Sequence, residues 1–74
     1  MQAQFNLGVM FYKGEGVPKD NVQAYAWISI AVAQGNNESW KKAKEIVTKS
    51  MTRDEITRAQ KLSDDLWKAF GSGP

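Results

Sequence analysis

The residues that constrain this chain most are Gly14, Gly16 and Pro18, which separate two helix-like patterns in its first half. Glycine takes the left-handed backbone values that end a helix at no steric cost. Proline cannot continue a helix, and it biases the residue before it toward an extended backbone. We therefore predict a rigid turn here. Asp20 follows as the N-cap of a second helix, with Gln23 placed to complete a capping box.

Apolar residues with helical spacing flank this turn on both sides. Before the turn they are Ala3, Leu7 and Phe11, with Met10 beside them. After the turn, residues 21–34 are apolar over a wider band than a surface helix buries. Such a helix needs neighbours on two sides, and we expect Trp27 to fill the space between its alanines. The two helices would form an antiparallel hairpin that ends at Gly35 and the Asn36–Asn37 pair.

The second half of the chain predicts two further amphipathic helices. Asn37 would cap the first, over residues 38–50, and Thr52 with Glu55 has the spacing of a capping box for the second. The predicted inner faces consist of Trp40, Ala43, Ile46 and Val47 in the first helix, and of Ile56, Ala59, Leu62, Leu66, Trp67 and Phe70 in the second. The side chains predicted to point outward from the first of these helices are Lys41, Lys42, Lys44, Glu45 and Lys49. Gly71 would close the last helix.

The hairpin residues follow one another in a specific order: Ala3, Leu7-Gly8, Phe11, Gly14-x-Gly16-Val17, Asp20, Ala24, Trp27, Ala31 and Gly35. This order resembles the Sel-one-like repeat, a relative of the tetratricopeptide repeat, over residues 3–35 of the 74. Phe11 stands where tyrosine is usual in that family, and Val32 replaces the second residue of an alanine pair. The resemblance implies an all-α fold, a fragment of a tetratricopeptide-like α-solenoid built from antiparallel helical hairpins.

We expect residues 1–74 to form a single all-helical domain, because a chain of this length holds one core at most. Residues 37–70 resemble the pair of C-terminal capping helices of bacterial members of that family. A terminal repeat needs such a cover, since each repeat has two adhesive faces. Residues 71–74 have the composition of a flexible tail, either natural or left from cloning.

The composition argues against catalysis. The chain has no cysteine and no histidine, which removes the thiolate nucleophile, the commonest general base and the commonest metal ligand. Gly14-x-Gly16 lacks the preceding strand and the following lysine and hydroxyl residue of a phosphate loop. Asp64 and Asp65 are adjacent, so they diverge around the helix instead of sharing a proton or a metal. We therefore expect no enzyme activity, no cofactor and no metal.

The charge pattern gives no reason to expect a nucleic-acid partner. The net charge is +2 with both signs interspersed, and lysines on the outer face of an amphipathic helix are ordinary. No stretch is long and apolar enough to span a bilayer, so no membrane partner is expected. We expect a cytoplasmic protein as the sequence is written, or a periplasmic one if a signal peptide precedes it.

The resemblance implies a protein-interaction or scaffold module, in which the first helix of each hairpin lines a groove for a peptide or protein partner. The candidate contacts are Gln4, Asn6, Val9, Tyr12 and Lys13. The alternative is a purely structural end of a larger solenoid with no partner of its own. Since the predicted cap covers only one side of the hairpin, we also expect self-association through its uncapped N-terminal face.

Overall fold

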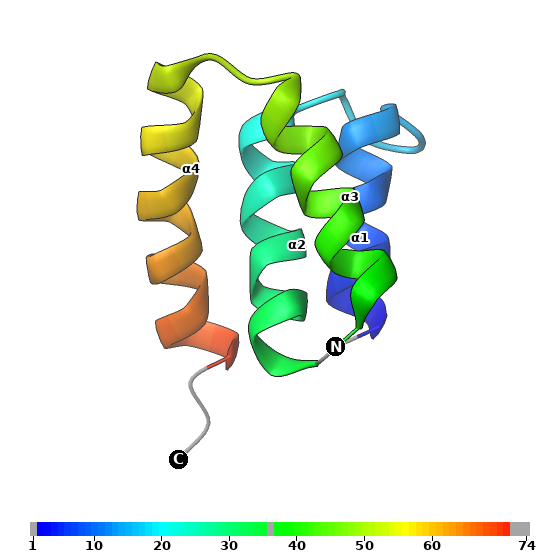
Figure 1. Ribbon diagram of the computed structural model, residues 1–74, viewed down its shortest axis with the longest axis vertical. Helices are drawn as coiled ribbons and strands as arrows, with labels where there is room; N and C mark the ends of the chain where they lie inside the picture. The colour runs from blue at the N-terminus through cyan, green and yellow to red at the C-terminus, as the bar shows by residue number, and fades with distance from the viewer. Residues whose placement is uncertain (1, 36, 72–74) are drawn as a thin grey trace.

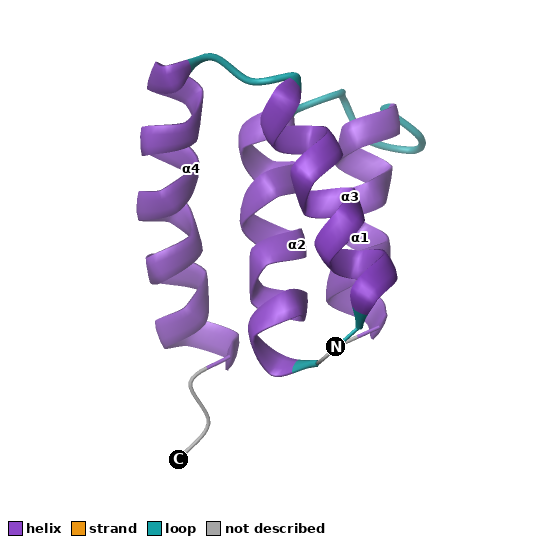
Figure 2. Cartoon of the chain, viewed as in Figure 1, coloured by secondary structure: helices purple, strands orange, loops and turns teal. Residues whose placement is uncertain are grey.

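The computed structural model describes residues 2–35 and 37–71, the last two of them by their backbone only. The helices are α1 (Gln2–Lys13), α2 (Asn21–Gln34), α3 (Glu38–Lys49) and α4 (Arg53–Leu66), and α4 continues as a π-helical turn, η1 (Trp67–Gly71) (Figure 1). No strand occurs within these described ranges (Figure 2). The predicted all-α fold is confirmed. The predicted tail beyond Gly71, the predicted inward position of Phe70 and the predicted stop at Asn36 lie outside what is described.

Helix α2 is the central element, because α1, α3 and α4 all pack against it. In Figure 1, α2 lies between α4 on one side and α1 and α3 on the other. Its buried residues are Ala24, Tyr25, Ala26, Ile28, Ile30 and Ala31. Ile28 and Ile30 point to roughly opposite sides of the helix, since residues two apart differ by about 200°. Burial of both confirms that α2 needs neighbours on more than one side.

Helices α1 and α2 approach each other closely at Gly8. A Cβ atom added to Gly8 would lie 2.6 Å from Ile28 Cγ1 and 3.1 Å from the carbonyl oxygen of Ala24. Any side chain at this position would therefore push the two helices apart. The glycine sets the distance between the helices and brings the α2 backbone directly against α1.

The turn between α1 and α2 contains the predicted left-handed glycines, and backbone hydrogen bonds join it to α1. Gly14 and Gly16 have φ values of 73° and 76°, the left-handed region that favours glycine. The amides of Gly14 and Glu15 donate to the carbonyl of Met10, at 2.7 and 3.1 Å. The amide of Asp20 donates to the carbonyl of Phe11 at 2.9 Å, so the far end of the turn is also tied to α1.

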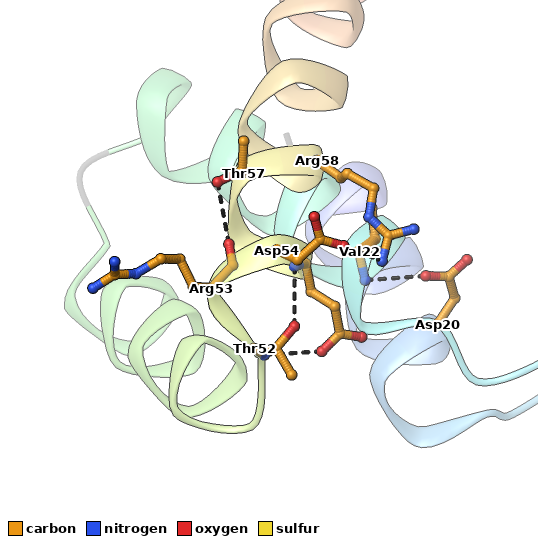
Figure 3. A network of polar contacts seen from close by, with 8 residues as sticks. Asp20, Val22, Thr52, Arg53, Asp54, Thr57 and Arg58 are labelled. Atoms are coloured by element: carbon orange, nitrogen blue, oxygen red, sulfur yellow. Dashed lines mark hydrogen bonds and ion pairs between the residues drawn. The ribbon is translucent and has the colours of Figure 1, made fainter.

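The predicted helix caps are formed at α2, α3 and α4. The Asp20 carboxylate accepts from the amide of Val22 at 3.0 Å (Figure 3). It also accepts from the amide of Gln23 at 3.2 Å. Asn37 caps α3 in the same manner, and Thr52 with Glu55 forms a complete capping box at α4. These caps satisfy amides that have no partner within their helices.

Two details at the ends of α2 differ from the prediction. The Gln23 side chain does not complete a capping box, because its Oε1 accepts from the indole N–H of Trp27 at 3.2 Å instead. Gly35 does end the helix, but its backbone is extended, with φ −127° and ψ 140°. The extended backbone leads directly toward Asn37, the N-cap of α3.

The tryptophan buried in the hairpin's contact with α3 is Trp40. The placement of Trp27 between helices stays a prediction. Trp40 is 9% exposed and stacks on Phe5, with ring centroids 5.1 Å apart and planes inclined by 17°. Trp27 is only half-buried. Burial of Trp40 confirms its predicted position on the inner face of α3.

Two assignments on α3 are also corrected. Ile46 was expected on the inner face, but it is 53% exposed. It lies about 100° from buried Val47, beyond the strip that contacts α2. Lys44 was expected to point to solvent, but it is half-buried, with its ammonium nitrogen 5.4 Å from the centre of the Tyr25 ring. The lysine stem covers apolar surface while its charge rests over an aromatic face.

We predict that Gly8→Ala destabilises the fold. The added methyl group overpacks the contact with Ile28, at a cost of about 1–3 kcal/mol, which exceeds the roughly 0.5–1 kcal/mol gained in helix propensity. Urea unfolding at one fixed protein concentration measures the difference. In an Ile28→Ala background the same substitution should cost less, because the nearest obstructing atom is gone. A Gly8→Ala variant more stable than the parent would contradict the proposed role of this contact.

We predict that Asp20→Ala lowers the free energy of unfolding by about 1 kcal/mol, because two α2 amides lose their acceptor. Asp20→Asn should retain most of that stability, since its side-chain oxygen can accept the same hydrogen bonds. Asp65→Ala, which removes an exposed carboxylate from α4, is the matched control. The same urea titration applies, and equal stabilities for Asp20→Ala and the parent would refute the cap.

Candidate functional site

The orientation of α1 is fixed by Gly8, which faces α2. Successive residues differ by about 100° around a helix axis. Gln4 and Tyr12 therefore lie only about 40° to either side of the direction of Gly8. Asn6 and Lys13 lie about 160° and 140° away from it, on the opposite side of the helix. The five predicted contact residues therefore do not share one face.

Of those five residues, Asn6 and Lys13 are exposed. Two residues that were not predicted lie on the same side, namely Gln2, whose amide nitrogen donates to Asn6 Oδ1 at 3.1 Å, and Met10, which is 37% exposed. We call Gln2, Asn6, Met10 and Lys13 the α1 stripe. Their spacing of four, four and three residues was the available signal, because it places them in a single row along a helix.

The other three predicted residues lie nearer the interior, and all three are half-buried. Tyr12 packs against the hydrophobic core, and the ammonium nitrogen of Lys19 lies 5.8 Å from the centre of its ring. The side-chain oxygen of Gln4 is buried and accepts no hydrogen bond. Val9 lies about 100° from Gly8, at the border between the packed and exposed sides.

The α1 stripe is a surface and not a cavity. No pocket is found in the described part of the chain, and the predicted groove stays a prediction. The stripe offers two carboxamides, each able to donate and accept, one ammonium group and one flexible thioether. These groups suit contact with a peptide backbone and a carboxylate.

Three amides of the glycine turn are already engaged in hydrogen bonds. The amides of Gly14, Glu15 and Asp20 all donate to α1 carbonyls. The amides in the first turn of a helix attract a phosphate when they have no other acceptor. In α2, two of these amides donate to the Asp20 carboxylate. These amides are therefore not available to bind a phosphate.

Two further kinds of site are not found among the described residues. No group of three or more acidic side chains there could hold a metal ion, and Asp64 and Asp65 are both exposed. None of the helices in that part of the chain has the length and apolar character to cross a membrane.

Comparison with known families identifies the hairpin. Residues 2–36 match the model of the Sel1 repeat, a stretch that includes α1, the glycine turn and α2. Neither the curated proteins nor the solved structures contain a match to this chain. The family match ends before α3, so the resemblance of the last two helices to a cap remains a prediction.

Proposed function

Because residues 2–36 are a Sel1 repeat, we propose that this chain is a non-enzymatic protein-interaction module whose α1 stripe contacts an extended segment of a partner protein. Sel1 repeats generally mediate protein–protein interactions and are generally not enzymes. The identity of the contacting surface is the new part of the proposal.

The observation that carries the proposal is that the α1 stripe lies outside the hydrophobic core. Asn6 and Lys13 are exposed, and Met10 exposes a large apolar side chain beside them. The remaining side chains of α1 that face α2 and α3, such as Phe5 and Tyr12, pack against the hydrophobic core. A row of amide, thioether and ammonium groups left outside the packing is available to a partner.

The chemistry of the stripe indicates what kind of segment fits. Carboxamides of Gln2 and Asn6 can pair with the donors and acceptors of an extended peptide backbone. Lys13, at the last turn of α1, supplies the positive charge for a carboxylate, either an acidic side chain or a free C-terminus. We therefore propose a peptide that carries a carboxylate as the preferred ligand.

The alternative is a structural solenoid end that binds nothing. It requires the α1 stripe to be inert, and no observation favours it. The two functions differ in one measurable property, which is whether any peptide depends on Asn6 and Lys13 for binding.

We predict that the double variant Asn6→Ala/Lys13→Ala loses peptide binding without losing the fold. Peptides would be selected against the parent chain from a random library displayed with free C-termini. The selected peptides should bind the double variant at least about tenfold more weakly, or about 1.4 kcal/mol. Fluorescence anisotropy measures the affinity, and far-UV circular dichroism verifies the fold.

Gln60→Ala/Lys61→Ala is the matched control, because it removes the same two chemical groups from exposed positions on α4. Its affinity should equal that of the parent. Amidation of the peptide C-terminus, or of its acidic side chains, should reproduce the loss caused by Lys13→Ala. Peptides that bind the parent and the double variant equally would refute the α1 stripe as the binding surface.

A further inference from the structure

Helix α2 carries a second hydrophobic pattern, which alternates from one residue to the next. Its even-numbered positions up to residue 32 are all aliphatic: Val22, Ala24, Ala26, Ile28, Ile30 and Val32. Its odd-numbered positions up to residue 29 are polar or aromatic, and two alanines follow: Asn21, Gln23, Tyr25, Trp27, Ser29, Ala31 and Ala33. An aliphatic residue at every second position is the pattern of a β-strand that buries one face. The same residues therefore suit a strand as well as the buried helix that they form.

Local preference does not hold α2 in the helical state. Six of its 14 residues are β-branched or aromatic, types that favour strands over helices: Val22, Tyr25, Trp27, Ile28, Ile30 and Val32. The helix contains no charged residue, so no ion pair between successive turns supports it. An isolated helix of this length is marginal in water. Its helical state therefore depends on the Asp20 cap and on packing against α1, α3 and α4.

The folded structure hides the alternating pattern. Ile28 and Ile30 are 0% and 1% exposed, and Ala24 and Ala26 are fully buried as well. Because Ile28 and Ile30 point to roughly opposite sides of the helix, burial of both requires neighbours on both sides. Figure 1 shows α2 between α4 and the pair α1 and α3. Separation of α2 from the helices on either side exposes part of the aliphatic set.

We propose that α2 converts from a helix to an intermolecular β-strand when the helices around it open. Residues 22–33 of separate copies then stack in register as a cross-β assembly. Such a stack places each residue beside its own copy, so a charged residue would repel itself and a proline would interrupt the hydrogen bonds. Residues 22–33 contain no charged residue, no proline and no glycine. The β-branched side chains at even positions supply the closely packed face between sheets.

The residues that flank this segment limit where such an assembly can form. Pro18, Lys19 and Asp20 precede it, and Glu38 is the next charged residue after it. Charges and prolines beside a hydrophobic segment oppose its stacking. The strand core is therefore confined between Asp20 and Glu38.

This inference goes beyond the proposed function and rests on different residues. It concerns α2, whereas the proposed peptide contacts belong to α1. A copy that converts loses the hairpin, so conversion would remove the α1 stripe from use. Peptide binding is measured on the folded chain and the conversion on the opened chain, so either proposal can fail without the other.

Incubation of the full chain in urea, at the midpoint of its unfolding transition, tests the proposal. Folded and opened copies coexist there. We expect fibrils that bind thioflavin T and give the fibre-diffraction repeat of about 4.7 Å between strands. Limited proteolysis with mass spectrometry should find the protected core within residues 21–37.

Ala33→Lys is the variant that tests the segment, because Ala33 is exposed in the folded chain and the substitution leaves the core intact. Stacked lysines repel each other, so the lag before fibrils appear should lengthen at least about threefold. Ala69→Lys makes the same change at an exposed position in η1 and is the matched control, with the lag of the parent. Each chain is incubated at its own unfolding midpoint, and far-UV circular dichroism without urea verifies its fold.

Three results would overturn the proposal. The first is a parent chain that forms no fibrils at its midpoint. The second is a protected core outside residues 21–37, which would assign the assembly to another helix. The third is an equal lag for Ala33→Lys and the parent.

Discussion

The contact of Gly8 with Ile28 and the backbone of Ala24 is the constraint on which the arrangement of this molecule depends. A glycine at this point lets α1 lie against the backbone of α2, and that fixes which side of each helix is inner. Every later assignment follows from it, including the side that stacks on α3 and the row of polar residues that faces solvent. A larger residue here would change the spacing of the hairpin and hence both surfaces.

Local features of this fold could be predicted from sequence, because their causes lie within a few residues. The left-handed glycines at the turn, the Asp20 cap and the Thr52–Glu55 capping box each depend on short-range geometry and chemistry. The aromatic partner of Trp40 could not be predicted in the same way. The inward position of Trp40 follows from helical spacing, but its stacking on Phe5 depends on where α3 crosses the hairpin, and no local pattern determines that crossing.

The candidate site was only partly predictable for a related reason. Asn6 and Lys13 were correctly placed on the outside of α1, whereas Gln4 and Tyr12 were grouped with them although both lie close to the direction of Gly8. The sequence gives the angle between any two residues around the axis of α1. It does not give the direction in which α1 meets α2. Once Gly8 supplies that direction, Gln2 and Met10 join the exposed row.

The hydrogen bonds that close the glycine turn also affect the order in which the chain folds. Three backbone hydrogen bonds join the turn to Met10 and Phe11 of α1, so the hairpin is held by partners close together in the sequence. Contacts of this kind close short loops and lose little chain entropy, which favours rapid formation. Packing of α4 onto α2 joins more distant segments. We therefore expect the hairpin to assemble early and to act as the template on which α3 and α4 are later ordered.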